Sequence, residues 1–540
     1  MAFTCVVYYC RGAVRAENND ALIEAITSAN SFHLPLVVVF FFPEHLSARR
    51  GAFWLEGCRE AIEGMKSRGC FPVVYRAADV SPILQFFTLK AAEVFLDSVF
   101  LPDELVFDAA CLNYYGPRCR IISTATVIPV DRMVNTPLYS AFVPRAQALM
   151  DTYLSLPEDP QQGGLLAVRS SSLPHLPSIE QLDPADKTLL PHLVLDPTVV
   201  PAQGWVGGTT SARIRLQAFL DELINYPTSL TSADSPNSSR LSPWLAEGHI
   251  SPAEVVLAAQ LYVARLSESE RNLVIPGLKA FIESVVFRRE LCFNHIFHNQ
   301  DCYRRFLNLT LNSDLIDVGN AIMLTLPEWS RSTLANHTAD LRPLETPAVL
   351  VELGKTPDLF WNSIHRLFIA SGFLHPPVRV YWARKLLEFF LTPEEAFGMA
   401  WKLNNKYSID AGTLALPALC SAFGLFSTAS DVEIPIYGLL PSAEAALKSG
   451  EAKRTRRSSV VEGQGLNVKK IITEAELAIE ENWATLTVDD SAGIGMRRVS
   501  FSEGKKEHGV DYSLGIHFPG EPRTTADTER ITSFDLLEQP

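Results

Sequence analysis

Two neighbouring helical patterns between residues 358 and 390 carry the side chains best suited to chemistry. Trp361 and His365 fall on one face of the first pattern, and Trp382 and Phe389 fall on one face of the second. Basic residues stand beside this apolar face at Arg379, Arg384 and Lys385. A cationic rim next to buried indoles can hold an anionic, aromatic ligand. Spacing alone favours another interpretation, an amphipathic helical hairpin in the core with a solvated basic face.

A second stretch is rich in hydroxyl groups. It reads Ser238-Ser239-Arg240-Leu241-Ser242-Pro243-Trp244-Leu245, and Ser251-Pro252 follows it. Hydroxyls and unpaired backbone amides at a helix start suit a diphosphate, because the N–H groups and the helix dipole both favour an anion. Ordinary helix capping explains Ser251-Pro252 equally well.

Two further stretches combine charged and amide side chains. Phe287-Arg288-Arg289-Glu290-Leu291 is followed by Asn294, and Leu403-Asn404-Asn405-Lys406-Tyr407 is followed by Asp410. An Arg-Arg-Glu triplet is also common on a salt-bridged helix surface. The residue types in these two stretches therefore do not by themselves distinguish a binding site from a helix surface.

Short apolar runs predict strands in the N-terminal part of the chain. The predicted strands are Val6–Tyr9, Leu36–Phe42, Phe71–Tyr75, Glu104–Phe107 and Ala125–Val130. A helix is expected from Asn19 to Ser28, between the first two, and this alternation is typical of a parallel doubly wound sheet. No Gly-x-Gly-x-x-Gly or P-loop motif is present in the sequence, which argues against a standard dinucleotide or P-loop site.

The chain beyond residue 150 changes character twice. We expect an α/β domain over residues 1–150, a Pro/Ser/Gly-rich linker over 151–204, a helical domain over 205–440, and a mostly disordered polar tail over 441–540. Helix boundaries near the indoles are predicted at Gly372, before Pro376-Pro377, and at the capping box of Thr392-Pro393. A basic cluster, Lys453 to Arg457, fits either a nuclear-import signal or a solvated charge run.

Composition limits the function classes. The 540 residues are 47% hydrophobic with a net charge of -14, so a nucleic-acid site has to be a local basic cleft on an acidic body. Nine cysteines without metal-ligand spacing indicate buried thiols in a reducing compartment and no metal site. No apolar run is long enough to span a membrane, and no signal peptide precedes the first strand. We therefore expect an intracellular monomer.

Together these stretches resemble the class II DNA photolyases of the photolyase/cryptochrome family. That family shows Trp-Asn-Ala, Gly-Lys-Met-His-Gly and Arg-Met-Tyr-Trp-Ala-Lys-Lys-Ile-Leu-Glu-Trp where this chain has Trp361-Asn362, Gly372 to His375, and Arg379 to Phe389. It also shows Ser/Thr-Ser-x-Leu-Ser-Pro-Tyr-Leu, Arg-Arg-Glu-Leu-Ala-Asp-Asn and Leu-Asn-Asp-Arg-Tyr-Glu-Leu-Asp at the other stretches. Arg11-x-x-x-Arg15 after the first strand matches the family's N-terminal domain, so the resemblance covers about residues 5–425.

The resemblance implies an α/β domain followed by an all-helical FAD-binding domain. The implied reaction is light-driven repair of cyclobutane pyrimidine dimers in UV-damaged DNA, with an antenna chromophore of folate or deazaflavin type as a further candidate. Electron relay by Trp382 and Trp361 and a lesion contact by Glu290 are implied as the catalytic roles. The implied FAD-binding residues are Ser238, Ser239, Leu241, Ser242, Arg289, Asn294, Asn362, His375, Arg379 and Asp410. The expected DNA-binding rim consists of Arg288, Arg304, Arg305, Arg384 and Lys385.

Several positions depart from the family pattern. Ser284 replaces a glutamate of the flavin site, and Thr413 and Ala415 replace an aspartate and an asparagine that address the isoalloxazine ring. Phe389 stands where the outermost indole of the electron relay is expected, and the tryptophan that stacks against the lesion is missing near Cys420. These departures leave open a second function, a photolyase-like protein that has lost repair and acts as a light sensor or non-catalytic DNA-binding protein. A scaffold without flavin is the third alternative.

Overall fold

The structure is a computed structural model that describes residues 3–43, 46–76, 80–100, 102–159, 181–186, 190, 194, 199–202, 204–229, 238–306 and 309–447. The chain divides into two units, Met1–Ala484 and Thr485–Pro540, and every described residue lies in the first. The expected tail beyond residue 447, its basic cluster and most of the expected linker lie outside the described residues. The expected domain boundaries therefore stay a prediction.

A mostly parallel sheet forms the first part of the described chain. Its strands are ordered β5-β4-β1-β2-β3-β6, and all neighbours pair in parallel except the last pair. The bounds are β1 (Cys5–Cys10), β2 (Leu36–Phe42), β3 (Phe71–Arg76), β4 (Ala91–Asp97), β5 (Cys119–Ile122) and β6 (Gln181–Leu182). β1 is buried along its whole length, as its unbroken apolar run predicts. The doubly wound sheet expected from the sequence is confirmed.

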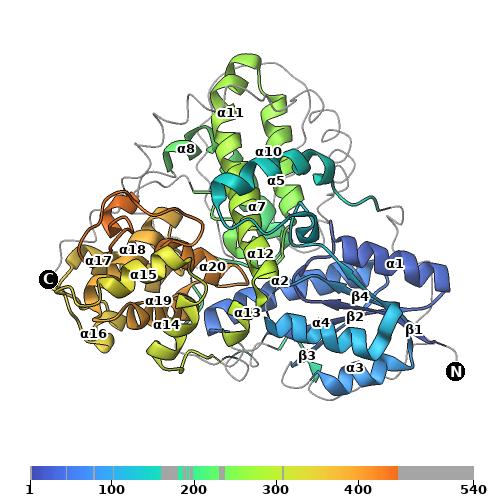
Figure 1. Cartoon of the computed structure of the whole chain (residues 1–540). Coiled ribbons are helices and arrows are strands. Elements are labelled where there is room, and N and C mark those ends of the chain that lie inside the picture. The colour runs from blue at the N-terminus through green and yellow to red at the C-terminus, as the bar shows by residue number, and fades with distance from the viewer. Residues whose placement is uncertain are drawn as a thin grey trace, which may run out of the picture. The chain divides into compact units, whose positions relative to one another are not determined.

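Helices cover both faces of this sheet. α1 (Asp20–Phe32) and α2 (Ala48–Ser67) pack on the face that carries Val6 and Tyr8, and α3 (Ser81–Thr88) and α4 (Pro102–Tyr115) pack on the face that carries Val7 and Tyr9 (Figure 1). Successive side chains of a strand point to opposite faces, which explains this division. The expected crossover helix is α1, capped by the Asn19 side chain, which accepts a hydrogen bond from the Leu22 amide.

Two of the predicted strands are wrong. Glu104–Phe107 lies inside helix α4, and Ala125–Val130 is an irregular segment that leads into a short 3₁₀ helix, Val130–Arg132. The true fourth and fifth strands are Ala91–Asp97 and Cys119–Ile122. An apolar run of four residues fits a buried strand and one turn of an amphipathic helix equally well, and here the tertiary packing decides.

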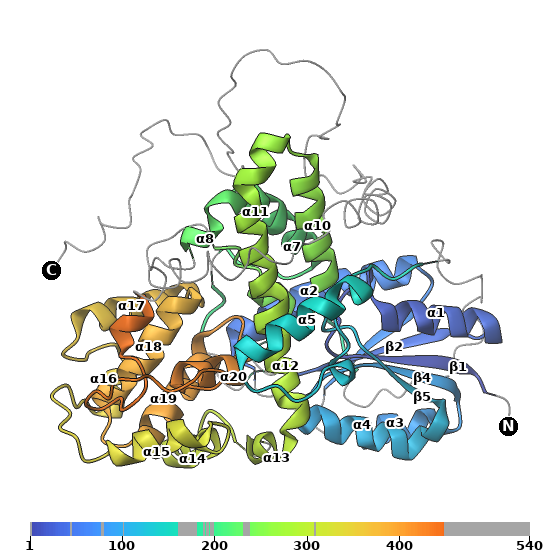
Figure 2. The ribbon, with the colours of Figure 1, turned by 45° about the horizontal axis from the view of Figure 1, so that its top comes forward.

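The remaining described chain is mainly helical. Its helices are α5 (Tyr139–Tyr153), α7 (Thr209–Leu220), α8 (Tyr226–Ser229), α9 (Ser242–Ala246), α10 (Pro252–Arg265), α11 (Glu268–Ile282), α12 (Arg289–His298), α13 (Gln300–Tyr303), α14 (Leu315–Met323), α15 (Glu328–Asn336), α16 (Ala348–Glu352), α17 (Leu359–Ser371), α18 (Pro376–Phe389), α19 (Pro393–Tyr407) and α20 (Ala415–Cys420). α17, α18 and α19 lie side by side in both ribbon views (Figure 2). None of the described helices is long and apolar enough to cross a membrane. All nine cysteines are free thiols.

The helix boundaries around the indoles follow the expected local rules. Asp358 caps α17 by accepting a hydrogen bond from the Trp361 amide, and α17 ends at Gly372 with a φ of 70°. α18 then begins with Pro376, whose missing N–H costs nothing in the first helical turn. Thr392 and Glu395 form the predicted capping box of α19. These boundaries fix the turn that brings His375 to the start of α18.

The sheet part and the helical part pack through close backbone contacts. Gly248 has a φ of 68°, and a Cβ atom at this position would lie 2.0 Å from the Gly12 carbonyl oxygen. The buried Arg15 side chain donates hydrogen bonds to the carbonyls of Gly248 and Thr124 at 3.1 and 3.2 Å. Arg49 of α2 likewise donates to the Tyr407 carbonyl at 2.8 Å.

We predict that Gly248→Ala destabilises the protein strongly. The left-handed backbone alone costs an alanine about 1 kcal/mol, and the clash with Gly12 adds roughly 1–3 kcal/mol of overpacking. Gly116→Ala is the matched control, because Gly116 has a φ of 58° but a Cβ atom added there would meet nothing within 4 Å. Urea denaturation measures both losses, and equal losses would contradict the close packing between the two parts.

Candidate functional site

A buried carboxylate joins three segments that are far apart in the sequence. Asp410 accepts hydrogen bonds from the Ser242 hydroxyl at 2.6 Å, the Ser408 hydroxyl at 2.5 Å and the Arg379 guanidinium at 2.8 Å. Burial raises the pKa of Asp410, but Arg379 and the two hydroxyls outweigh it, so the pKa lies below its ordinary value. The start of α9, the first turns of α18 and the end of α19 therefore meet around one ionised group.

A loop of residues 238–241, called the cationic loop because it contains Arg240, lies next to this carboxylate. Arg240 has a φ of 54°, which is a strained conformation for a residue other than glycine, and its side chain is exposed. Arg215 of α7 holds the loop in place, because its guanidinium donates hydrogen bonds to the Ser238 and Ser239 carbonyls, each at 2.8 Å. α9 has only five residues and no side-chain cap, so the cations and hydroxyls, rather than a helix dipole, give this loop its affinity for anions.

Two polar groups beside the loop lack partners among the described residues. Both ring nitrogens of His375 and Nε of Arg379 are buried without a hydrogen-bond partner there. Burial, helped by the nearby Arg240 charge, lowers the pKa of His375 to about 4, so the imidazole is neutral at neutral pH. A buried polar atom without a partner is costly, and a bound ligand with donors and acceptors would satisfy both groups.

The residues that should face a flavin ring are less suited to it. Ala415 is buried and has no polar side-chain atom, and it stands at the start of α20 where the family has an asparagine. Thr413 is half-buried in the turn before it. The loop therefore offers groups that suit a diphosphate, while Ala415 offers no side-chain partner to a flavin ring.

The two predicted relay indoles form a stacked pair inside the helical part. Trp361 and Trp382 are fully buried, with ring centroids 6.3 Å apart and an angle of 7° between the rings. The Trp361 indole N–H donates to the Trp382 carbonyl at 2.9 Å. Because Arg379 and Trp382 lie one turn apart on α18, the stack begins next to the cationic loop.

The outer end of the stack is a phenylalanine, as the sequence predicts. Phe389 packs edge-on against Trp361 with centroids 5.1 Å apart, and it is fully buried. Tyr381 packs against Phe360, whose side chain is half exposed. No tryptophan among the described residues extends the stack from Trp361 to the surface by a ring contact in this structure.

The polar residues of α12 make most of their hydrogen bonds to the segment between residues 125 and 136. Glu290 is buried and accepts hydrogen bonds from the Val127 and Ile128 amides, the first at 2.5 Å. Four residues on, the Asn294 side chain accepts from the Thr136 amide and donates to the Val134 carbonyl. Arg289 donates to the Ala125 and Leu245 carbonyls. Glu290 and Asn294 thus bond to the segment between residues 125 and 136, and the expected lesion contact of Glu290 and flavin contacts of Arg289 and Asn294 stay predictions.

The direction of α12 has an identifiable cause. A π-helical segment, Glu283–Arg288, connects α11 to α12, and each extra residue in a wider turn rotates the following side chains around the helix axis. Ser284 lies inside this segment and donates to the Ala280 carbonyl at 3.0 Å.

Asn362 also has a structural position. Its side chain accepts from the Thr356 amide at 3.0 Å and donates to the Thr356 carbonyl at 2.8 Å, and it is buried. Leu241 is fully buried in the core that α9 shares with α10. Of the expected cofactor residues, Ser238, Ser239, Ser242, His375, Arg379 and Asp410 surround the cationic loop, and their roles toward a cofactor stay a prediction.

The expected DNA rim is corrected in part. Arg384 and Lys385 are buried rather than exposed. Arg384 donates to the Ala422 carbonyl, and Lys385 pairs with Asp358, Glu388 and Glu444 at 2.9–3.3 Å. Both residues lie beside the apolar face of α18. Residues between Ala422 and Glu444 contact this side of the helix. They stabilise the fold and are not available to phosphates.

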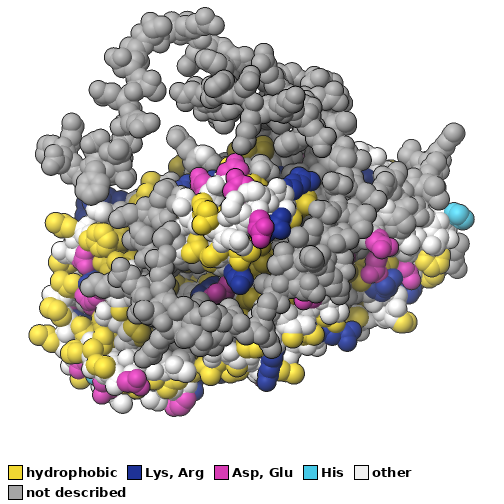
Figure 3. Space-filling model, turned by 90° about the horizontal axis from the view of Figure 1, so that it is seen from above, with side chains coloured by type: hydrophobic (Ala, Val, Ile, Leu, Met, Phe, Trp, Pro, Cys, Tyr) yellow, Lys and Arg dark blue, Asp and Glu magenta, His cyan; other side chains and the backbone are white. Residues whose placement is uncertain are grey.

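The other expected rim residues are exposed. Arg288 lies over the Tyr139 ring and pairs with Glu283 at 3.0 Å, Arg304 pairs with the exposed Asp301 at 3.2 Å, and Arg305 is exposed. On the face seen in Figure 3, dark blue Lys and Arg side chains are scattered between hydrophobic and acidic ones. DNA binding would therefore rest on a few local cations, as the net charge of -14 also requires.

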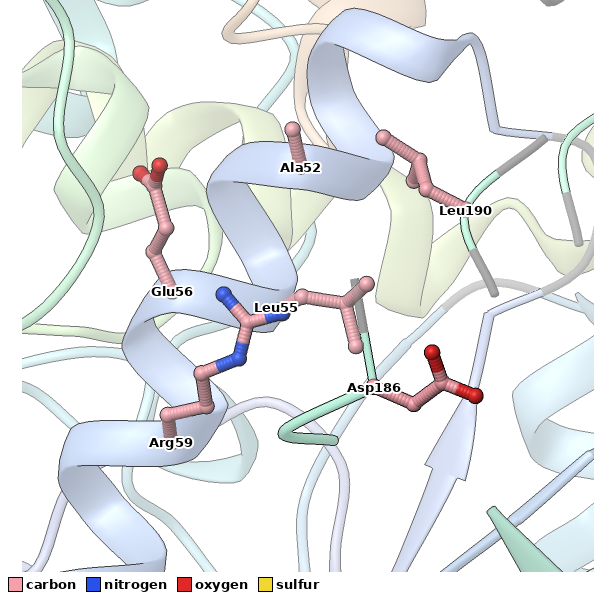
Figure 4. Close-up of a pocket in the computed structure, with 6 residues that line it drawn as sticks. All are labelled: Ala52, Leu55, Glu56, Arg59, Asp186 and Leu190. Atoms are coloured by element: carbon pink, nitrogen blue, oxygen red, sulfur yellow. The ribbon is translucent and has the colours of Figure 1, made fainter. Parts of the chain in front are cut away.

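Two features of the sheet part bear on the expected antenna chromophore. At the point where the strand order reverses, between β1 and β4, the Arg11 guanidinium pairs with Glu104 and Asp108 at 2.9 and 2.6 Å. This ion cluster occupies the crevice where doubly wound sheets usually bind ligands. Elsewhere, a shallow pocket on α2 has its charged residues already engaged, because Glu56 accepts from the Gly207 amide at 2.7 Å and Arg59 donates to the Pro184 carbonyl (Figure 4). Neither feature supports the antenna chromophore, which stays a prediction.

Sequence reasoning missed three residues of the site. Arg240 stood in the hydroxyl-rich motif but was passed over as a variable position, and its positive φ marks it in the structure. Arg215 has no sequence signal, because it acts through two carbonyls of a loop more than 20 residues away. His365 was placed on the apolar face of the first helix, where its spacing from Trp361 is the one available signal.

Comparisons with known proteins agree with this architecture. The family model described as DNA photolyase matches residues 6–162. The chain is 29% identical over 413 residues to the deoxyribodipyrimidine photo-lyase of Methanothermobacter thermautotrophicus, which covers 75% of this chain and 82% of that protein. Among solved structures, a class III photolyase from Agrobacterium tumefaciens has a TM-score of 0.54 at 18% identity, covering 90% of this chain and 99% of that one. A Synechocystis cryptochrome has a TM-score of 0.54 at 15% identity, covering 88% and 100%.

The chain is thus similar to DNA photolyases over about three quarters of its length, and it shares the fold of the photolyase/cryptochrome structures. The family resemblance seen in the sequence is thus confirmed, together with the expected architecture of an α/β part followed by helices. At 15–18% identity the solved structures speak for the fold alone. Assignment to class II stays a prediction.

We predict that Glu290 makes the stability of the protein pH-dependent. Burial raises the pKa of Glu290 from 4.5 to about 8, although two backbone amides and Arg289 oppose this. Between these pH values the folded protein holds a proton that the unfolded chain has lost, so the free energy of unfolding falls as pH rises, by up to about 1 kcal/mol per pH unit. The loss is complete above the folded pKa.

Glu290→Gln removes this titration while keeping an oxygen that accepts from the two amides. Urea denaturation of both proteins from pH 5.5 to 8.5 measures the difference in their free energies of unfolding. The free energy of unfolding of the unchanged protein minus that of Glu290→Gln should fall steadily up to about pH 8 and then level off. A value that stays constant with pH would contradict the prediction, because it would mean that Glu290 is ionised throughout the range.

Proposed function

We propose that the protein repairs cyclobutane pyrimidine dimers in UV-damaged DNA, with FAD as cofactor and light as the energy source. The observation that carries the proposal is the cluster of Ser242, Asp410 and Arg379 beside the unpartnered imidazole of His375, with two stacked indoles one helical turn away. An anion-binding loop next to buried, easily oxidised rings suits a flavin dinucleotide. Members of the photolyase/cryptochrome family bind FAD, and the curated relative is named a deoxyribodipyrimidine photo-lyase.

The residues around the loop have separable tasks. Ser238, Ser239, Ser242 and Arg240 would hold the diphosphate, because hydroxyls and a guanidinium supply charge-assisted hydrogen bonds to its oxygens. Arg379, which is paired with Asp410, and the neutral His375 would hold the ring side. Reduced FAD, when bound and excited by light, supplies the electron that splits the dimer. The protein's part is to exclude water from the site and to keep Trp382 beside it.

Recognition of damaged DNA would rest on local cations. Arg288, Arg304 and Arg305 are the exposed candidates, and contacts to phosphates need no base sequence. A dimer is already poorly paired, so turning it out of the duplex costs less than turning out an intact base. This favours damage over sequence as the feature that is recognised.

A second function, a light-sensing or non-catalytic DNA-binding protein, is favoured by two observations. Glu290, the expected lesion contact, is buried against residues 127 and 128. The stack that would supply electrons to the flavin ends in the buried Phe389. Either change weakens repair without preventing flavin binding.

We predict that Arg240→Gln raises the dissociation constant for FAD about tenfold or more, since a hydrogen bond to a charged group contributes roughly 1.5–3 kcal/mol. Arg240 is exposed, so the fold should be unaffected. Arg366→Gln, which changes an exposed arginine on α17, is the matched control. Titration of flavin-depleted protein with FAD measures both constants. Equal dissociation constants for FAD in the two variants would show that the cationic loop does not bind FAD.

The repair assay separates the two functions. Purified protein with chemically reduced FAD is mixed with a dimer-containing oligonucleotide and exposed to blue light. Restored thymines, counted by chromatography and absent in the dark control, are the expected result. Protein that holds FAD and binds the oligonucleotide but restores no thymines would favour the sensor or binding function. Protein that holds no FAD would overturn both.

A further inference from the structure

A histidine ring lies against both indoles of the stack. The His365 ring is parallel to Trp361 within 18°, with centroids 4.8 Å apart, and parallel to Trp382 within 17°, with centroids 6.1 Å apart. The Trp382 indole N–H points at Nδ1 of His365, with the two nitrogens 3.3 Å apart. His365 is fully buried, so no water competes for this contact. One histidine nitrogen is therefore the direct partner of the indole proton of Trp382.

The other nitrogen fixes the protonation state of the ring. Nε2 of His365 lies 3.1 Å from the Glu352 carbonyl oxygen, which can only accept, so Nε2 carries the proton. Nδ1 is then a free lone pair, which matches the donor direction of the Trp382 indole. Burial lowers the pKa of His365, although Glu352 opposes this, so the ring is neutral at neutral pH. A neutral imidazole with its lone pair on an indole N–H is arranged to accept a proton.

The surroundings give that proton a favourable place. A positive charge on Trp382 would lie next to Trp361 and Phe368, which are apolar and fully buried. A positive charge on His365 would instead lie next to the Glu352 carbonyl and close to the Glu352 carboxylate, which pairs with Lys402 and Lys406 at 3.3 and 2.9 Å. Charge in an apolar core is costly, so moving it from the indole toward Glu352 lowers the free energy.

We propose that His365 is the proton acceptor for Trp382 when that indole is oxidised. In this step Trp382 gives one electron to the photoexcited oxidised flavin of the proposed function. Its Nε1–H bond breaks, and the proton forms a bond to Nδ1 of His365. Trp382 becomes a neutral radical, and His365 becomes an imidazolium with a proton on each nitrogen. Because the stack ends at Phe389, this proton transfer takes the place of moving the charge outward to a third indole.

His365→Gln and His365→Phe separate hydrogen bonding from proton acceptance. A glutamine oxygen can accept the indole hydrogen bond but is far too weak a base to take the proton, and phenylalanine keeps a stacked ring without any acceptor. Phe368→Leu is the matched control, because Phe368 packs edge-on against Trp382 with ring centroids 5.3 Å apart, while the indole N–H donates to His365. The readout is the radical spectrum after a flash of blue light on flavin-loaded protein.

In the unchanged protein and in Phe368→Leu, we expect the absorption of the tryptophan cation radical to convert to that of the neutral radical, more slowly in D₂O. In His365→Gln and His365→Phe the cation radical should persist until it recovers its electron, and the lifetime of the charge-separated state should shorten at least several-fold. A neutral radical that forms at the same rate in His365→Gln as in the unchanged protein would overturn the role of His365.

A measurement without flavin tests the geometry separately. The indole N–H resonance of Trp382 in the unloaded protein should lie downfield and move strongly in His365→Phe but little in Phe368→Leu. A resonance that is the same in His365→Phe means that the hydrogen bond is absent, which overturns the inference while leaving the proposed function intact. Folded protein that takes up no flavin overturns the proposed function, and with it the photochemical step, even where the resonance confirms the hydrogen bond.

Discussion

The arrangement of the site depends on one buried carboxylate, Asp410. Its oxygens are shared between Arg379 on α18, Ser408 at the end of α19 and Ser242 at the start of α9, so a single ionised group ties together three segments that are separated by up to 168 residues. Removing one partner of such a buried pair leaves an uncompensated charge, which costs several kcal/mol, roughly 3–5. The same contact keeps Arg379 in place above the first turn of α18. Trp382 lies three residues after Arg379, about one turn further along α18, so fixing Arg379 also helps to fix Trp382. Trp382 in turn stacks with His365 and Trp361.

Local rules predicted much of the fold. The apolar run Leu36–Phe42 became a strand with the expected bounds, and Gly372, Pro376 and the capping box of Thr392 ended or began helices where their chemistry requires it. The predicted strand at Glu104–Phe107 was wrong, because a stretch of four residues with three apolar side chains carries too little periodicity to distinguish a strand from a helix turn. The change from short apolar runs to helical periodicity predicted the order of the two parts, and the resemblance implied the same order.

The site was predicted less completely, for physical reasons. The family resemblance placed Ser242, His375, Arg379 and Asp410 in one site, and the structure does bring Ser242, Arg379 and Asp410 into contact. Glu290 was expected to contact the lesion and Lys385 to lie on the DNA-binding rim, yet both side chains are buried, Glu290 against the amides of Val127 and Ile128 and Lys385 beside Glu444. In both cases these partners are distant in the sequence from the motif itself. His365 shows the converse, since a residue that spacing placed in the core makes a specific hydrogen bond to an indole.

The proposed function requires that the cationic loop and the indole stack serve one bound flavin. The most direct measurement is the absorption spectrum of the purified, folded protein before and after blue light in the presence of a thiol reductant. We predict flavin bands at close to one flavin per chain that bleach on illumination, because Trp382 lies next to the site and can give up an electron. Folded protein without flavin bands, even after incubation with FAD, would contradict the central claim and leave the helical part as a scaffold.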